Sequence, residues 1–322
     1  MNQRNAGAVR WRAAMERALY GDGGFFRAEA GPAAHFRTSA HASPLFAGAI
    51  ATLLERVDEA LDHPARLDLV DVGAGRGELL RSILAALPPA VAARVSAVGV
   101  EVAPRPEHLP PTIGWTSAIP SGITGLLVAT EWLDNIPVEV VELDSTLRPR
   151  YWRSTPDGAL TLDESPLEPG DARWLADWWP LAGLPEGARA EVGAPRDEAW
   201  AAATASVARG MALAVDYGHL AGDRPLFGTL TGFRDGRETA PVPDGSCDLT
   251  IAVALDSLGV HHLLTTQREA LRLLGVDGRR PPLALASTDP AGYVRALARA
   301  GQAAELTDPA GLGGHHWVMY WV

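Results

Sequence analysis

Residues 67–79 read Leu-Asp-Leu-Val-Asp-Val-Gly-Ala-Gly-Arg-Gly-Glu-Leu, and this stretch decides the fold. Residues 67–72 form a short apolar run of the kind expected for a buried strand. Alternate glycines follow at positions 73, 75 and 77, and a helical pattern begins at Glu78. Because glycine permits a tight turn and a close approach of the backbone to a ligand, the stretch predicts a strand, a ligand-binding loop and a helix.

The alternation of strands and helices continues along the chain. Further strands are predicted at residues 94–101, 112–115, 123–129, 137–143 and 211–216, and further helices at 8–20, 44–61 and 265–274. This order is typical of an α/β fold with a mostly parallel sheet. Residues 315–322 are rich in strand-forming residues, so we expect an antiparallel C-terminal edge strand that pairs with residues 302–306.

Two long connections interrupt this pattern. The strands at 123–129 and 211–216 are separated by about 80 residues, too many for a plain crossover. We predict that residues 67–322 form one domain with insertions at about 138–205 and 217–262, the first acting as a cap. Trp174, Trp178 and Trp179 are expected to form the core of that cap. Residues 1–66 are expected to form an N-terminal helical lid segment.

Charge and composition limit the possible partners. The chain has 322 residues, 47% hydrophobic and 21% charged, and a net charge of −11. An acidic protein is repelled by nucleic acid and by anionic membranes but attracts a cationic substrate. No apolar stretch approaches the roughly 20 residues of a membrane-spanning helix. With a single cysteine, Cys247, these features predict a cytoplasmic protein, and none of them indicates an oligomeric state.

The glycine loop does not match the dinucleotide-binding pattern Gly-x-Gly-x-x-Gly. Counted from Gly73 the third glycine is replaced by Glu78, and counted from Gly75 it is replaced by Leu80. Glu101 ends the next predicted strand, where a carboxylate can accept hydrogen bonds from two ribose hydroxyls. Asp71 can face a positively charged amino group. A cofactor with a ribose, an ammonium and a sulfonium but no phosphate is S-adenosylmethionine, which we therefore predict.

The chain also resembles the MidA-type class I methyltransferases, which are related to the mitochondrial complex I assembly factor with arginine methyltransferase activity. The resemblance is carried by Ala18-Leu-Tyr-Gly-Asp-Gly-Gly-Phe-Phe26, Phe36-Arg-Thr-Ser39, Ser43-Pro-Leu-Phe46, Asp71-Val-Gly-Ala-Gly-Arg-Gly-Glu-Leu79, Thr130-Glu-Trp-Leu-Asp-Asn-Ile-Pro-Val138, Asp216-Tyr-Gly218, Gly228-Thr-Leu-Thr-Gly-Phe-Arg234 and Asp248-Leu-Thr250. It implies a Rossmann-like class I sheet. This sequence departs from the family at Ala74, where proline is usual, and at Thr130, where asparagine is common.

The loop and the resemblance together define a candidate site. The predicted cofactor-binding residues are Asp71, Gly73, Ala74, Gly75, Gly77, Glu101, Val102, Thr38, Ser39 and Ser117. Glu131 and Asp134 are the predicted catalytic residues, and Asn135 and Tyr217 are expected to join them in binding substrate. Two carboxylates after one strand can hold a guanidinium through paired hydrogen bonds, which favours an arginine in a protein or peptide as the substrate.

Two other functions remain open from the sequence. The departure at Thr130 and the large cap also fit a methyltransferase that acts on a small molecule or a peptide natural product. A cofactor-binding assembly factor that mainly holds a partner protein fits the same loop. A metal site is not predicted, because neighbouring residues of the pairs His261-His262 and His315-His316 point to opposite sides of a strand.

Overall fold

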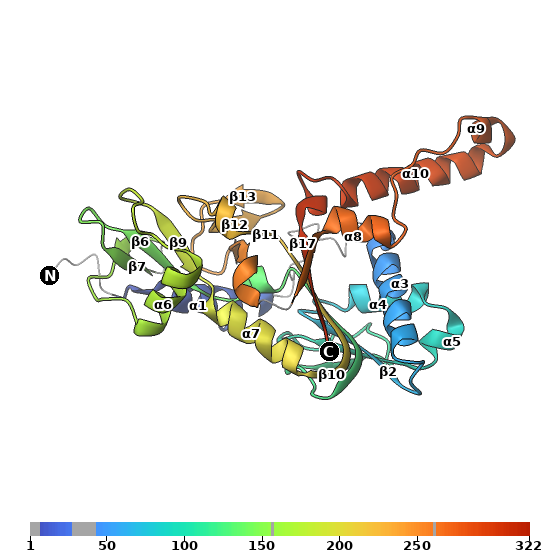
Figure 1. The fold of residues 1–322 in the computed structure, drawn as a ribbon, viewed down its shortest axis with the longest axis horizontal. Coiled ribbons are helices and arrows are strands. Elements are labelled where there is room, and N and C mark those ends of the chain that lie inside the picture. The colour runs from blue at the N-terminus through green and yellow to red at the C-terminus, as the bar shows by residue number, and fades with distance from the viewer. Residues whose placement is uncertain (1–6, 28–42, 156–157, 260–261) are drawn as a thin grey trace. The chain divides into compact units, whose positions relative to one another are not determined.

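The computed structural model describes residues 7–27, 43–155, 158–259 and 262–322 (Figure 1). The chain divides into two compact units. The first unit comprises Met1–Phe36, Trp132–Ala202 and Tyr217–His261, and the second comprises Arg37–Glu131, Ala203–Asp216 and His262–Val322. No helix in the described part of the chain combines the length and the apolar character needed to cross a membrane.

A seven-stranded sheet forms the centre of the second unit. Its strands lie in the order β16-β17-β10-β5-β2-β3-β4. Five neighbours are mutually parallel, namely β10 (Val207–Asp216), β5 (Ile123–Thr130), β2 (Leu67–Val72), β3 (Val95–Val100) and β4 (Gly114–Thr116). The predicted mixed α/β fold with a large, mostly parallel sheet is thus confirmed.

The position predicted for the C-terminal strand is wrong. Strand β17 (His316–Trp321) is antiparallel, as expected, but it lies between β10 and the true edge strand β16 (Leu263–Thr266). Residues 302–306, its predicted partner, end helix α10 (Pro290–Leu306). In α10 the buried residues Ala300, Ala303 and Leu306 recur every three residues, which is a helical spacing, so this segment packs through one helix face.

Helices cover one face of the large sheet and bury its core. Helix α3 (Pro44–Ala60) begins at Ser43, whose side chain accepts a hydrogen bond from the Leu45 backbone, and proline occupies its first turn. Helices α4 (Glu78–Ala86), α8 (Gln267–Leu273) and α10 also contribute buried residues to this core, α10 through Ala303 and Leu306, whereas α5 (Pro89–Ala92) and α9 (Ala284–Thr288) are short. Leu69, Val128 and Trp317 supply the buried sheet side of the core.

The first unit consists of smaller sheets and their own helices. One sheet joins β1 (Val9–Arg10), β7 (Pro149–Ser154), β6 (Glu139–Leu143) and β9 (Arg189–Val192), with β8 (Leu160–Leu162) beside β7. The others are β11 (Gly218–His219) with β15 (Val253–Ala254), and β13 (Arg237–Thr239), β12 (Thr231–Arg234) and β14 (Asp248–Thr250). The helices are α1 (Trp11–Tyr20), α6 (Pro169–Trp178) and the larger part of α7 (Ala194–Ala205).

The tryptophans of the first insertion are core residues, as predicted. Trp174 and Trp179 are buried among Val141, Tyr151 and their neighbours, and Trp178 packs against the same cluster. The indole nitrogen of Trp174 donates to Asp197 at 2.6 Å, so burial leaves this polar atom satisfied. The lid role expected for residues 1–66 stays a prediction.

Two glycines allow the central strands to approach closely. A Cβ atom on Gly125 of β5 would collide with the carbonyl oxygen of Asp68 in β2, and one on Gly210 of β10 would collide with the carbonyl oxygen of Gly125. Gly125 has a φ of +146° and Gly210 a φ of +125°, values that a side chain rarely tolerates. Only glycine therefore fits both the space and the backbone conformation at these two positions.

We predict that Gly125→Ala destabilises the fold by about 2–4 kcal/mol, because the new methyl group must displace backbone atoms of β2. Gly48→Ala is a matched control, since Gly48 lies inside α3 with no atom within 4 Å of its would-be Cβ. That change should be neutral or stabilise by up to about 1 kcal/mol. Urea unfolding of both variants measures the difference, and equal stabilities would contradict the packing described here.

Candidate functional site

The glycine loop connects β2 to α4 through a defined set of backbone hydrogen bonds. The amides of Gly73 and Ala74 both donate to the Val100 carbonyl of β3, at 2.9 and 3.2 Å. The Gly77 amide donates to the Ala74 carbonyl at 2.8 Å and closes the turn. All three glycines have positive φ, at +74° for Gly73, +56° for Gly75 and +76° for Gly77. The loop conformation therefore requires the alternate glycines seen in the sequence.

Space around the loop differs between Gly75 and Gly77. A Cβ on Gly77 would lie 2.5 Å from Leu109 Cδ1, so a side chain there would displace Leu109 in addition to straining the backbone. A Cβ on Gly75 would meet only Glu78 Oε2, at 3.8 Å. The backbone at Gly75 is thus open to a ligand, while the backbone at Gly77 packs against the protein.

Glu101 follows β3 and its carboxylate binds the loop directly. Oε2 accepts from the Gly75 amide at 3.0 Å, and Oε1 accepts from the amides of Val102 at 2.7 Å and Ala103 at 3.3 Å. The Glu101 amide in turn donates to Thr116 at the end of β4. The carboxylate predicted to bind a ribose therefore lies beside the glycine loop, held by three backbone donors.

Asp71 is a buried carboxyl group in β2 next to this loop. It is 2% exposed, and its Oδ1 has no hydrogen-bond partner among the residues that the structure describes. Burial, then the negative charges of Glu101 and Glu78, raises the pKa of Asp71 from 3.8 to about 8. Three acidic groups around an open glycine backbone suit a ligand with positive charge and hydroxyl donors, and they disfavour a phosphate. The residues present thus fit S-adenosylmethionine.

The other predicted cofactor residues differ in position. Val102 is 46% exposed and lies next to Glu101. Ser117 is exposed and follows β4 directly, after the Thr116 carbonyl that binds Glu101. Thr38 and Ser39 lie outside the described residues. The structure therefore brings Asp71, the glycine loop and Glu101 together, with Val102 and Ser117 on the adjoining strand ends.

Glu131 follows β5, the neighbour of β2 in the large sheet. Its backbone has a φ of +50°, uncommon for a residue with a side chain, and its amide donates to the Val215 carbonyl of β10 at 2.8 Å. Such backbone strain often occurs at functional positions and costs about 1–3 kcal/mol. Because β2 and β5 are parallel, Glu131 and the glycine loop lie at the same, carboxyl end of the sheet.

Asp134, Asn135 and Tyr217 belong to the first unit, where the buried Asp134 and Asn135 and the half-buried Tyr217 take part in polar contacts. Asp134 is 4% exposed, and its Oδ2 accepts from the hydroxyls of Tyr217 and Thr250, both at 2.8 Å. Asn135 Nδ2 donates to Asp248 Oδ1 at 3.1 Å. Burial raises the pKa of Asp134, and the two hydroxyl hydrogen bonds oppose that rise. In the structure this carboxylate fixes the segment after Glu131 to β14.

Arg196 holds the same segment, although no sequence pattern marks this residue. Its side chain is 2% exposed, and its terminal nitrogens donate to the carbonyls of Asp134 at 2.7 Å and Ala252 at 3.1 Å. Thr250 was also not singled out, although it ends the Asp248-Leu-Thr250 segment of the resemblance. Arg196 carries no local motif, so only the tertiary structure identifies it.

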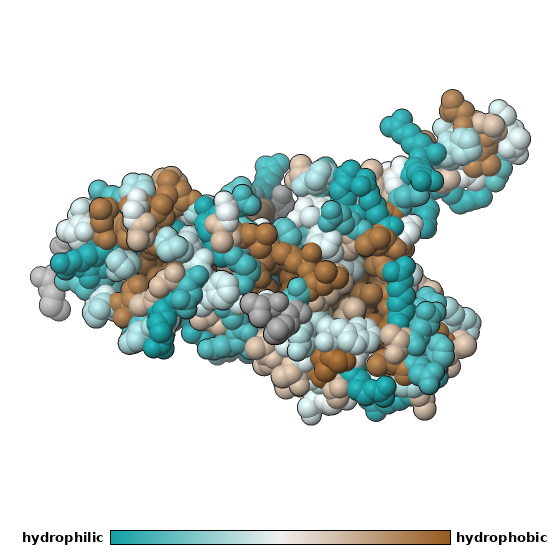
Figure 2. All heavy atoms as spheres, in the orientation of Figure 1, coloured by the Kyte–Doolittle hydropathy of each residue, from teal (hydrophilic) through white to brown (hydrophobic). Residues whose placement is uncertain are grey.

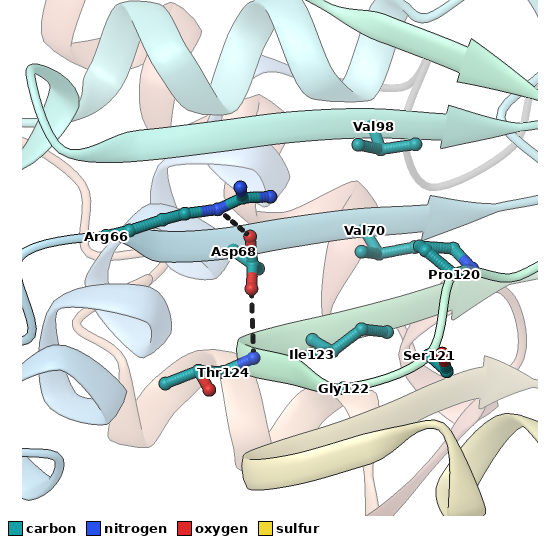
Figure 3. Close-up of a pocket in the computed structure, with 9 residues that line it drawn as sticks. All are labelled: Arg66, Asp68, Val70, Val98, Pro120, Ser121, Gly122, Ile123 and Thr124. Atoms are coloured by element: carbon teal, nitrogen blue, oxygen red, sulfur yellow. Dashed lines mark hydrogen bonds and ion pairs between the residues drawn. The ribbon is translucent and has the colours of Figure 1, made fainter.

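Outside the glycine loop, the described residues include a further cavity but no cluster suited to a metal ion. No group of three or more His, Cys, Asp or Glu side chains is placed to hold a metal ion within the described ranges. A cavity of about 430 Å³ is lined by Arg66, Asp68, Val70, Val98, Pro120, Ser121, Gly122, Ile123 and Thr124 (Figure 3). It includes the first residues of β2 and β5, so it lies at the opposite end of these strands from the glycine loop.

Comparison with known proteins decides the family. Residues 49–273 match the family described as "Putative S-adenosyl-L-methionine-dependent methyltransferase". The chain belongs to this family. The matched region includes the glycine loop, Glu101 and Glu131. The protein is therefore an S-adenosylmethionine-dependent methyltransferase, which confirms the predicted enzyme class, its cofactor and the resemblance to MidA-type methyltransferases.

Solved structures show the same fold as this methyltransferase. A Burkholderia thailandensis protein crystallised bound to S-adenosyl-homocysteine has a TM-score of 0.79 and 23% sequence identity, with 99% of this chain and 89% of that chain covered. A native crystal structure of an uncharacterized protein from the same organism gives a TM-score of 0.78, 23% identity and coverage of 99% and 88%. No curated protein matches the sequence.

Glu101→Gln tests the carboxylate beside the loop. We expect the change to weaken S-adenosylmethionine binding to the methyltransferase by about 1–3 kcal/mol, the usual loss for a charge-assisted hydrogen bond. Titration calorimetry measures this, with Glu107→Gln as the control because Glu107 is exposed in the same connection. If the wild type and Glu101→Gln bind S-adenosylmethionine with equal affinity, Glu101 does not contribute to cofactor binding.

Asp71 predicts a pH dependence of stability in the cofactor-free methyltransferase. Its folded-state pKa of about 8 lies above the unfolded value of 3.8, so the folded state holds more protons between these values. Stability contributed by this group must fall as pH rises through that window and level off above it. Thermal unfolding from pH 5 to pH 9 should show the wild type losing stability relative to Asp71→Asn, and parallel profiles would contradict this.

Proposed function

We propose that the seven-stranded sheet is a Rossmann-like class I methyltransferase sheet whose glycine loop binds S-adenosylmethionine, and that the enzyme methylates a guanidinium nitrogen of a protein arginine. The observation that carries the proposal is the set of carboxyl groups around the open loop, formed by Asp71, Glu78 and Glu101. The order of five parallel strands followed by an antiparallel β17 inside the edge strand supports the class I assignment.

Each part of the proposed cofactor site has one task. Glu101 accepts hydrogen bonds from ribose hydroxyls, and in the structure its carboxylate already lies against the Gly75 amide at 3.0 Å. Asp71 faces the ammonium group, which would restore the ionised form that burial disfavours. Val102 and Ser117, and Thr38 and Ser39 from the N-terminal segment, complete the contacts. When bound, the cofactor supplies a methyl group activated by the sulfonium.

The substrate part of the proposal rests on Glu131. The strained backbone holds Glu131 directly after β5, where its amide donates to the Val215 carbonyl. A carboxylate can hold the plane of a guanidinium through two hydrogen bonds and accept the proton that the nitrogen loses when it gains a methyl group. The net charge of −11 favours the approach of a basic protein or peptide.

Asp134, Asn135 and Tyr217 are proposed to serve substrate binding from the first unit. The hydrogen bonds from Tyr217 and Thr250 keep the Asp134 carboxylate in one orientation, and Arg196 holds the backbone at the same residue. A fixed segment of this kind limits the shapes of substrate that fit, because Asp134 and Asn135 are buried and all three side chains are already hydrogen-bonded.

The direct test is to follow a labelled methyl group. The protein is incubated with S-adenosylmethionine labelled at the methyl carbon and with a cell lysate, and the protein and small-molecule fractions are separated. Label recovered as methylarginine after acid hydrolysis supports the proposal. Label in small metabolites, or in another residue, would refute the arginine substrate. Cofactor binding without any transfer would show that the protein holds partners instead of modifying them.

Glu131→Gln separates chemistry from cofactor binding. We expect transfer to fall by about a hundredfold or more, because the amide neither neutralises a guanidinium nor accepts its proton. Cofactor affinity, measured by calorimetry, should stay within about twofold of the wild type. Glu139→Gln in β6 is the matched control. The Glu139 carboxylate accepts one described hydrogen bond, from the Arg12 backbone amide, and has no proposed part in the reaction. Transfer at the wild-type rate in Glu131→Gln would exclude the proposed role.

A further inference from the structure

One face of the large sheet carries a row of residues that runs from β5 to β4. The register pairs Val128 of β5 with Asp71 of β2, and Asp71 with Gly99 of β3. Gly99 in turn pairs with Trp115 of β4. Paired residues of neighbouring strands point to the same side of a sheet, so the four positions share one face. Asp71 is the polar member of this row, and the position beside it on β3 has no side chain.

The indole ring of Trp115 fills the space that Gly99 leaves. A Cβ on Gly99 would lie 2.6 Å from Trp115 Cζ3 and 3.1 Å from the Cβ of Ala74 in the glycine loop. The ring therefore occupies the place beside Asp71 that a side chain at position 99 would take. It also packs toward the glycine loop, because the Ala74 methyl group meets the same point.

The same indole holds the segment that follows Glu101. Its Nε1 donates to the Ala103 carbonyl at 3.1 Å. The amides of Val102 and Ala103 are two of the three backbone donors to the Glu101 carboxylate. One side chain of β4 thus links Asp71, the turn at Ala74 and the Glu101 segment.

Arg105 fixes the rest of the connection between β3 and β4. Its guanidinium donates to the carbonyls of Leu109 at 3.1 Å, Pro110 at 2.8 Å and Ile113 at 2.6 Å. Leu109 also packs at Gly77, where its Cδ1 would lie 2.5 Å from an added Cβ. The connection is therefore tied down along its length, and the Trp115 indole is the tie nearest to Glu101.

Surface hydropathy points to no single site, because hydrophobic residues reach the surface in several separate places on the face shown in Figure 2. The contacts of Trp115 are more specific. It is half-buried, packs against the core to which Leu69 and Val128 belong, and satisfies its one polar atom at Ala103. This position suits a residue that acts through its neighbours and not through direct contact with a ligand.

The ring also affects the charge of Asp71. The charged groups that face Asp71 are Glu101 after β3 and Glu78 of α4, while Val128 and the Trp115 ring beside it carry no charge. Burial is the largest cause of the raised pKa of Asp71, ahead of the two carboxylates. Removal of the ring would admit water and lower the pKa of Asp71 toward its ordinary value.

We propose that Trp115 is a positioning residue of the cofactor site, whose indole holds the Ala74 turn and the Glu101 segment and covers Asp71 in the space above Gly99. The inference rests on the proposed cofactor site. Such a residue forms the site before the ligand arrives, so less of the chain must be ordered on binding. Loss of the indole then weakens binding although no group that contacts the cofactor is removed.

Calorimetry with S-adenosylmethionine tests the role in binding. Trp115→Phe keeps an aromatic ring but loses the N–H, and Gly99→Ala keeps Trp115 but displaces its ring. Each should raise the dissociation constant about threefold to tenfold. The controls are Trp321→Phe, 46% exposed at the end of β17, and Gly114→Ala, whose Cβ would meet the Val98 side chain at 3.2 Å. Both controls should stay within about twofold of the wild type.

Hydrogen exchange in the cofactor-free protein separates positioning from a general loss of stability. The amides of Val102 and Ala103, which donate to Glu101, should exchange about tenfold faster in Trp115→Phe than in the wild type. Trp321→Phe should leave these amides unchanged. Faster exchange throughout the large sheet, without a larger effect at these two amides, would show that Trp115 only stabilises the fold.

The pH profile of thermal unfolding tests the cover over Asp71. In the wild-type background, Asp71→Asn should remove the loss of stability expected between pH 5 and pH 9. In a Trp115→Leu background the same substitution should have about half that effect or less, because the pKa of the exposed carboxyl moves toward its unfolded value and less proton release falls in this range. Trp115→Phe, which retains a ring, should preserve most of the effect.

Unchanged affinity in both Trp115→Phe and Gly99→Ala would overturn the proposal when Glu101→Gln does weaken binding. Unchanged affinity in Glu101→Gln as well would overturn the proposed cofactor site, and with it the role of Trp115. An equal effect of Asp71→Asn in the wild-type and Trp115→Leu backgrounds would contradict the covering role. Circular dichroism confirms that each variant is folded, and the two milder variants keep the binding test available if Trp115→Leu does not fold.

Discussion

The Val100 carbonyl of β3 anchors the start of the glycine loop, because it accepts hydrogen bonds from the amides of both Gly73 and Ala74. This one acceptor fixes the point where the chain leaves β2 and turns toward α4. The same turn places Asp71 inside the sheet and Gly75 on the open side, against the Glu101 carboxylate. The positive φ values of Gly73, Gly75 and Gly77 are what allow a chain to make these contacts within five residues. Loop, strand end and carboxylate thus depend on one another.

The sequence predicted this part of the molecule well because its signals are local. A buried parallel strand, alternate glycines and a helix occupy thirteen consecutive residues, and Glu101 is recognisable as the polar residue that ends the next apolar run. Such segments depend mainly on their own composition. The helix predicted at 44–61 is likewise marked by Ser43 and Pro44, whose capping roles the structure shows directly.

The sequence did not predict contacts between residues that lie far apart along the chain. Residues 315–322 are clearly strand-forming, but composition does not identify their partners, β10 and β16, which begin more than a hundred and about fifty residues earlier. The same reason hides Arg196, whose carbonyl partners at 134 and 252 lie 62 and 56 residues away. A buried arginine with backbone partners has no sequence pattern, since any carbonyl can accept from it.

The carboxyl groups at the loop also explain why the site favours a cation. Asp71 lies in the protein interior with Glu101 and Glu78 nearby, and burial and these two negative charges make ionisation of Asp71 less favourable. The ligand-free protein therefore holds a proton at Asp71 near neutral pH. A ligand ammonium removes that penalty by replacing the proton with a fixed positive charge, whereas an anionic ligand increases it. In the proposed cofactor site, selectivity for a phosphate-free, positively charged cofactor would then follow from where β2 ends, before any contact specific to its adenine or its methyl group is made.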